Sequence, residues 1–216
     1  MKNVAIKPIL FNKQISTEMV QAILDGRKTC TRRVIKPQPD EKHTYTLGFV
    51  TDSTEKKEVG CFGFAANEYG GSIQYVKPPY RYAPGDILYV RETWCDDRQF
   101  THASTPGRYF YKASESGNFK WKPSIHMSKE AARIWLKVTN VRVERLQEIA
   151  AESALAEGAD KYIHTNGELD ENMTITSFIG IWNSTIKKSD LDRYGWNANP
   201  WVWVIEFERC EKPEGV

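Results

Sequence analysis

Residues 16–35 read STEMVQAILDGRKTCTRRVI, and this stretch decides how the chain begins to fold. Its first half predicts a short amphipathic helix over 17–25, because apolar side chains recur at helical spacing behind a Ser16 or Thr17 cap. Those apolar side chains are Met19, Val20, Ile23 and Leu24. Gly26 supplies the stop signal of the helix, and a strand is expected to follow until Pro37 breaks it.

Beyond this stretch the pattern predicts several short strands and two further helices. Apolar and β-branched runs predict strands at 44–50, 60–64, 73–76, 87–91, 108–112, 134–143 and 201–208. Helical spacing predicts helices at 148–157 and 178–186. The segment from about 40 to 84 is rich in Gly, Tyr and Thr and is typical of an inserted β-hairpin region. We therefore expect one α+β domain over 1–216, a small barrel-like sheet with helices alongside.

Charge is distributed unevenly along the 216 residues, although the formal net charge is only +2. Residues 1–39 carry eight basic groups and two acidic groups, whereas residues 141–180 carry three basic and eight acidic groups. This asymmetry indicates either that the two segments face each other or that one of them presents a binding surface to an anion.

Several classes of protein are excluded by what the sequence lacks. No run approaches the roughly 20 apolar residues that cross a bilayer, and the first residues lack the apolar core of a secretory signal. We therefore expect a cytoplasmic protein without membrane contact. Neither the cysteines nor the histidines show the spacing of a disulfide framework or a metal site, and no cofactor motif is present. These residues are Cys30, Cys61, Cys95, Cys210, His43, His102, His126 and His164.

The densest group of reactive side chains lies between Gly26 and Arg33, in the pattern GxKxxxxR that includes Lys28. At this point the chain resembles the ASCH domains, which belong to the PUA-like superfamily of small β-barrels and carry this pattern after their first helix. The resemblance extends to 85–92 (GDILYVRE), to the segment 138–158 and to the closing 203–207 (WVIEF). The chain is most similar to the longer ASCH proteins of bacteria and their prophages.

That resemblance implies the fold, a PUA-like small β-barrel with flanking helices. It also implies an enzymatic activity. Family members include a metal-independent amidohydrolase that acts on 4-acetylcytidine through a lysine, a threonine and a glutamate. The matching positions here are Lys28, Thr31 and, through an ungapped helix, Glu157, with Glu152 as the fallback. The resemblance implies that the protein binds a modified nucleoside or an RNA. It implies no cofactor and no protein partner.

Elementary chemistry agrees with this assignment on two conditions. A threonine hydroxyl attacks a carbonyl only when a base removes its proton, and a lysine is such a base only in its neutral form. The cations Arg27, Arg32 and Arg33 favour the neutral amine, whereas an acidic helix facing them would oppose it. In a straight strand, residues 28 and 31 point to opposite faces, so their convergence requires the chain to be still turning at Lys28.

Other residues are candidates for substrate binding. Arg27, Arg32 and Arg33 could hold the substrate, and Arg91 with Glu92 could form an ion pair that lines the barrel mouth or a solvated pair at an edge. Three tryptophans in loop-like contexts could stack on a nucleobase, although core filling is the commoner role of a tryptophan. They are Trp94, Trp121 and Trp196.

Two other functions remain open at the level of sequence. The basic N-terminal segment could follow the phosphates of an RNA, which would make the protein an RNA-binding module or a single-strand ribonuclease. A phage accessory protein without catalysis would also carry these patterns. A Gly-Arg-Lys-Thr sequence at a helix end can be no more than a polar cap whose cations lie favourably against the helix dipole.

Overall fold

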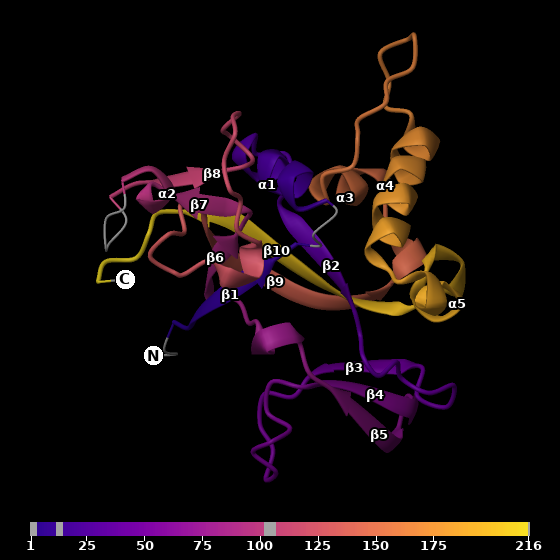
Figure 1. Cartoon of the computed structure of the whole chain (residues 1–216). Helices are drawn as coiled ribbons and strands as arrows, with labels where there is room; N and C mark the ends of the chain where they lie inside the picture. The colour runs from indigo at the N-terminus through magenta and orange to yellow at the C-terminus, as the bar shows by residue number, and fades with distance from the viewer. Residues whose placement is uncertain (1–3, 12–14, 102–106, 216) are drawn as a thin grey trace.

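A five-stranded sheet forms the centre of the computed structural model, which describes residues 4–11, 15–101 and 107–215 (Figure 1). Its strands lie in the order β1-β6-β9-β10-β2, with β1 parallel to β6 and the other pairs antiparallel. Their bounds are β1 Ile6–Leu10, β2 Cys30–Val34, β6 Ile87–Arg91, β9 Trp135–Arg145 and β10 Trp201–Cys210. The sequence predicted each of these strands except β1.

The sheet is open rather than a closed barrel. Within the described residues β1 and β2 are the two edges, and no ladder joins them. A side chain spans the gap instead, since the Arg33 guanidinium on β2 donates a hydrogen bond of 2.5 Å to the Leu10 carbonyl at the end of β1. The α+β class is confirmed, but the ladder of strands does not close.

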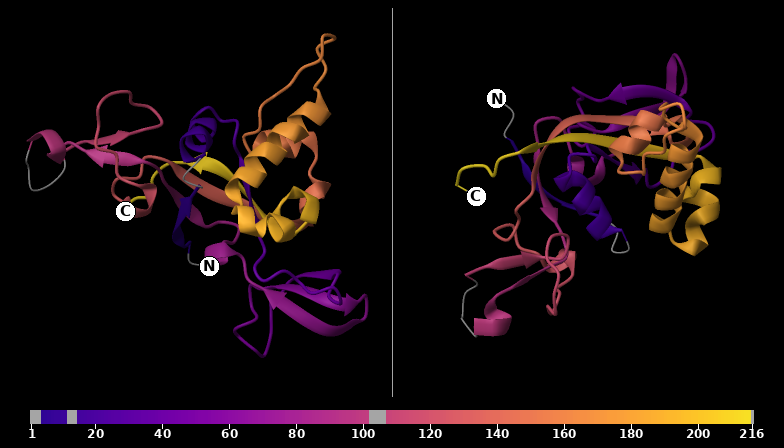
Figure 2. Two further views of the ribbon diagram at one scale, coloured as in Figure 1. Left: turned by 45° about the vertical axis from the view of Figure 1, so that its right-hand side comes forward. Right: turned by 90° about the horizontal axis from the view of Figure 1, so that it is seen from above.

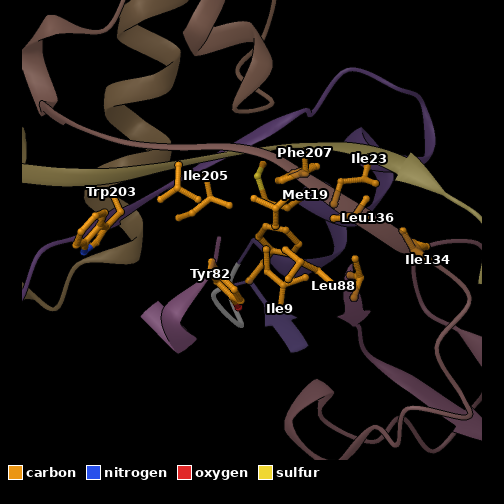
Figure 3. Close-up of a cluster of buried hydrophobic side chains, with 14 of the residues drawn as sticks. Ile9, Met19, Ile23, Tyr82, Leu88, Ile134, Leu136, Trp203, Ile205 and Phe207 are labelled. Atoms are coloured by element: carbon orange, nitrogen blue, oxygen red, sulfur yellow. The ribbon is translucent and has the colours of Figure 1, made fainter. Parts of the chain in front are cut away.

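Both faces of β10 are covered, as its nearly continuous apolar sequence predicted. Trp203, Ile205 and Phe207 point into the main core, together with residues of α1 (Ser16–Leu24) and β6 (Figure 3). Val202 and Val204 point to the other face, where α3 (Ala151–Ala156) and α4 (Glu171–Thr185) cover them. The sheet is therefore a layer between two apolar cores, and α4 stands beside it in both views of Figure 2.

The segment from 40 to 84 forms a second sheet, as predicted, with β4 between β3 and β5. The bounds are β3 Tyr45–Phe49, β4 Phe62–Asn67 and β5 Gly70–Val76. Phe62 and Phe64 are buried in the main core, where Phe64 meets the Trp201 ring edge-on at 5.1 Å between centroids. The insertion thus shares the core of the central sheet.

The remaining elements are short. The strands β7 (Trp94–Asp96) and β8 (Tyr109–Tyr111) pair as a hairpin, and α2 (Arg98–Thr101) and α5 (Leu191–Tyr194) are single turns. The predicted cap of α1 is wrong, because the helix already begins at Ser16 and the preceding Ile15 has no capping side chain. No helix in the described ranges is both long and apolar enough to cross a membrane.

Candidate active site

Lys28 lies in the bend between α1 and β2, where the sequence analysis required it to be. Gly26 adopts a φ of +75°, a conformation that favours glycine, and the N–H groups of Arg27 and Lys28 both donate to the Ala22 carbonyl at 2.9 Å. The chain is therefore still wrapped around the end of α1 at residue 28, and β2 begins only at Cys30. This bend sends the Lys28 side chain into the interior, where it is 1% exposed.

Glu157 reaches the same place from the end of α3. The next residue, Gly158, has a φ of +93° and packs so closely on α1 that a Cβ atom there would lie 3.4 Å from the side chain of Ala22. The Thr29 N–H also donates to the Ala156 carbonyl at 2.8 Å. These contacts fix the end of α3 against the bend that carries Lys28.

Lys28 and Glu157 form a buried ion pair. The Lys28 Nζ atom lies 2.7 Å from Glu157 Oε2 and donates a second hydrogen bond, also 2.7 Å, to the backbone carbonyl of Glu157. Arg32 places Nη1 3.4 Å from Glu157 Oε1 and donates from Nε to Glu144 at 2.8 Å. Arg142 contacts Glu144 at 3.1 Å and Glu206 at 2.6 Å, so three cations and three carboxylates form one network that carries no net charge.

The network changes the acidity of its neighbours. Burial disfavours the charged form of Arg32, but Glu157 and Glu144 outweigh that effect and raise the pKa of this guanidinium. Burial, reinforced by Glu157, raises the pKa of the Cys30 thiol to about 12. Cys30 is therefore a neutral, buried thiol rather than a nucleophile.

Thr31 lines the same pocket as Lys28 and Glu157, and it is 4% exposed. Its hydroxyl makes no hydrogen bond in the described part of the chain, so the Lys28 amine does not contact it directly. The innermost space is small, about 50 Å³, which at 10–15 Å³ for each water centre holds a few waters. A proton from Thr31 would reach Lys28 through such a water.

The inner pocket opens into a wider cleft of about 480 Å³ between β2 and α4. Phe11, Arg32, Arg33, Trp182 and Thr185 line both spaces, which makes them continuous. Phe11 and Trp182 are the aromatic residues of the shared wall, and the Phe11 ring has cations against it, with Lys28 Nζ at 5.5 Å and the Arg33 guanidinium at 5.7 Å from its centre. The cleft therefore combines flat apolar surfaces with positive charge.

Other predicted binding residues lie away from this pocket. Arg27 points outward and contacts Asp25 at 3.4 Å. The expected pairing of Arg91 with Glu92 is wrong, because Arg91 donates to the carbonyls of Met127 and Ile125. The buried Glu92 carboxylate instead receives two hydrogen bonds from Arg133, at 2.9 and 3.0 Å.

The three candidate tryptophans and the fallback carboxylate also lie outside the lining of the pocket. Trp94 is buried in a separate cluster, Trp121 packs on Phe119 with centroids 4.9 Å apart, and Trp196 packs edge-on against Phe178. Glu152 is exposed in the first turn of α3. Their place in the structure gives them no contact with the inner pocket.

The structure adds two groups that the sequence analysis did not single out for the site. Glu144 lies on β9, two strands away from Arg32. In the sequence, its spacing of two residues from Arg142 indicates only that Glu144 and Arg142 share a face of the strand. Trp182 packs in the core beneath α4 and also lines the cleft. Only the fold itself brings these residues to Arg32 and Thr31.

The charge asymmetry now has an explanation. The basic N-terminal segment and the acidic segment 141–180 face each other, through Lys28 with Glu157 and Arg32 with Glu144 and Glu157. Arg32 and Arg33 are therefore engaged inside the protein.

In the described ranges no group of three or more His, Cys, Asp or Glu side chains could hold a metal ion. Comparisons with protein-family models, curated proteins and solved structures give no match to the chain.

Proposed function

We propose that the protein is an amidohydrolase that removes an acyl group from the exocyclic amine of a modified cytidine such as 4-acetylcytidine, acting in the cytoplasm. The observation that supports it best is the convergence of Lys28, Thr31 and Glu157 on one pocket from two segments far apart in sequence, residues 28–31 and the end of α3. These are the positions that the ASCH resemblance implies. We further propose that the central sheet is a PUA-like barrel left open between β1 and β2.

The buried ion pair supplies a base and an acid together. In the charged state the proton lies on Lys28, and moving it across the 2.7 Å contact gives a neutral amine and a protonated Glu157. This shift changes no net charge. Arg32 opposes it by stabilising the carboxylate. The active form is then a minor tautomer of the pair that needs no proton from solvent.

The reaction follows in two steps from that tautomer. Thr31 Oγ1 forms a bond to the acyl carbon while its proton passes to Lys28, and the C–N bond breaks as Glu157 gives its proton to the departing amine. Water then attacks the acyl-threonine ester and gives a proton to Glu157. Lys28 returns its proton to Thr31, so a carboxylic acid leaves and the starting tautomer is restored.

The two connected spaces match the two parts of such a substrate. The inner 50 Å³ holds a group of the size of an acetyl, and the outer cleft lies within the roughly 300–1,000 Å³ range of small-molecule sites. A pyrimidine ring in the cleft would lie beside Phe11 and Trp182, aromatic surfaces on which a base can stack. The RNA-binding alternative has weaker support, because Arg32 is buried in an ion-pair network and Arg33 donates to the Leu10 carbonyl.

The decisive experiment is incubation of the full chain with 4-acetylcytidine, with chromatographic detection of cytidine and acetate. Thr31→Val keeps the shape of the side chain and removes the hydroxyl, so we expect turnover to fall by at least about 100-fold, the lower bound for losing such a group. Thr31→Ser is the matched control, since it keeps the hydroxyl and should retain most of the activity.

Equal turnover by Thr31→Val and wild type would contradict the proposed nucleophile. Absence of turnover by the folded wild type on 4-acetylcytidine and related acylated cytidines would contradict the proposal as a whole. Circular dichroism of each variant shows whether the fold is retained.

A further inference from the structure

A second cavity, larger than the inner catalytic pocket, lies where the inserted sheet meets the central sheet. Its volume is about 600 Å³, and its walls come from the loop after β3, the segment 77–84 and the middle of β9. Most of its lining is apolar, including Phe49, Val59, Tyr82 and Val141. It shares no lining residue with the catalytic pocket or the outer cleft.

The charged residues that line this cavity are both cations. Lys77 and Arg81 are the charged residues among those that line it, and no acidic residue is among them. In the described part of the chain neither side chain has an ion-pair or hydrogen-bond partner, in contrast to the buried cations Lys28 and Arg32. An apolar cavity with a few convergent polar groups is the usual form of a small-molecule site, and here those groups are unpaired cations.

The backbone that carries Arg81 is held in a costly conformation. Tyr80 and Arg81 have φ values of 49° and 53°, which cost non-glycine residues roughly 1–2 kcal/mol each. Lys7 fixes this turn, because its amine donates to the Arg81 carbonyl at 2.9 Å and pairs with Asp86. Strained residues of this kind persist where the surroundings hold them, and they cluster at ligand-binding positions.

From these observations we infer that the cavity binds a small amphipathic anion, with an apolar ring or chain in the cavity and one carboxylate or sulfonate at Lys77 and Arg81. A cationic ligand would find no carboxylate in the lining. A fully polar anion would leave the apolar walls unfilled. The geometry therefore points to an organic acid whose body is mostly hydrocarbon.

The test uses 8-anilinonaphthalene-1-sulfonate, an aromatic sulfonate whose fluorescence rises in apolar sites, titrated into the folded full chain. We expect saturable binding and displacement by decanoate at concentrations at least about tenfold lower than those of decanol or decyltrimethylammonium. Thr51→Trp places a large ring at an exposed lining position and should abolish binding. The double variant Lys77→Met/Arg81→Met should weaken binding of decanoate by roughly tenfold and that of decanol little.

Lys56→Met is the matched control, because Lys56 is an exposed cation of the same loop that does not line the cavity. It should bind the probe as wild type does. Unchanged binding in a folded Thr51→Trp variant, or equal displacement by decanoate and decyltrimethylammonium, would overturn the inference. Thr31→Val should bind the probe normally, so a failure of this inference and a failure of the proposed catalysis are separately visible.

Discussion

Replacing Glu157 by Gln should destabilise the protein by about 3–5 kcal/mol, because it leaves a buried cation without its counter-ion. The Lys28 side chain is 1% exposed and would keep hydrogen-bond acceptors in the carbonyl of residue 157 and the Gln amide oxygen, but it would lose the negative charge that balances its own. Arg32 would lose a weaker contact and keep Glu144. The unpaired charge is therefore that of Lys28, and its desolvation sets the magnitude.

Replacing Lys28 by Met should cost less, about 2 kcal/mol, since Glu157 still faces Arg32 at 3.4 Å. The double variant Lys28→Met/Glu157→Gln removes both charges together, and we expect it to be more stable than Glu157→Gln alone. The resulting coupling free energy is about 2–3 kcal/mol, near the upper end of the range for residues in direct contact.

The assay is urea unfolding of the four proteins at neutral pH, followed by tryptophan fluorescence and analysed as a double-mutant cycle. The pair Asp25 and Arg27 serves as control, because it is exposed and a contact of 3.4 Å in solvent should give a coupling of at most about 0.5 kcal/mol. Additive effects at Lys28 and Glu157, within about 0.5 kcal/mol, would refute the buried ion pair and with it the proton shift proposed for catalysis.

Three further predictions test other parts of the structure. Iodoacetamide at pH 8 should leave Cys30 unmodified in the folded protein, because a pKa of about 12 leaves about one thiol in 10⁴ as the reactive thiolate. After unfolding the reagent should label Cys30, and peptide mass spectrometry measures both results. Arg133→Met should cost about 3 kcal/mol at pH 7 and less at pH 5, since burial raises the pKa of Glu92 and removal of Arg133 raises it further. In that variant Glu92 gains its proton in the folded state before the unfolded state does, so stability rises as the pH falls; a penalty independent of pH in urea titrations would contradict this. In urea unfolding, Phe64→Ala should lower the free energy of unfolding by about 3–5 kcal/mol. Tyr75→Ala, at an exposed position of the same sheet, should lower it by less than about 1 kcal/mol. Similar losses at the two positions would show that the insertion does not share the main core.

Much of the fold was predictable because its signals are local. The stop at Gly26, the short strand-like runs of the insertion and the continuous apolar run of β10 each follow from a few neighbouring residues. The bend at Lys28 was predictable for a different reason: a straight strand would have separated Lys28 from Thr31, so convergence demanded a turn.

The parts that the sequence did not reveal depend on contacts between distant segments. Glu144 is 112 residues from Arg32, and nothing near either residue specifies that β9 and β2 flank the same strand. Arg91 is the last residue of β6 and Glu92 follows it directly, and neighbouring side chains of an extended chain point to opposite faces. Their proximity in the chain therefore argued against an ion pair rather than for one.

The position of β2 at the edge of the sheet explains how the site is built. Along a strand Thr31 and Arg33 point to one face and Arg32 points to the other, yet all three line the same pocket. In a closed barrel each strand has a neighbour on both sides, and a pocket could not reach around it. At an open edge the cleft passes around β2 and meets both faces, so the network of Arg32 with Glu157 lies beside Thr31 although the two side chains point apart. The opening between β1 and β2 is thus a requirement of this site, and only the Arg33 side chain, through its bond to Leu10, joins the two edges across it in the described residues.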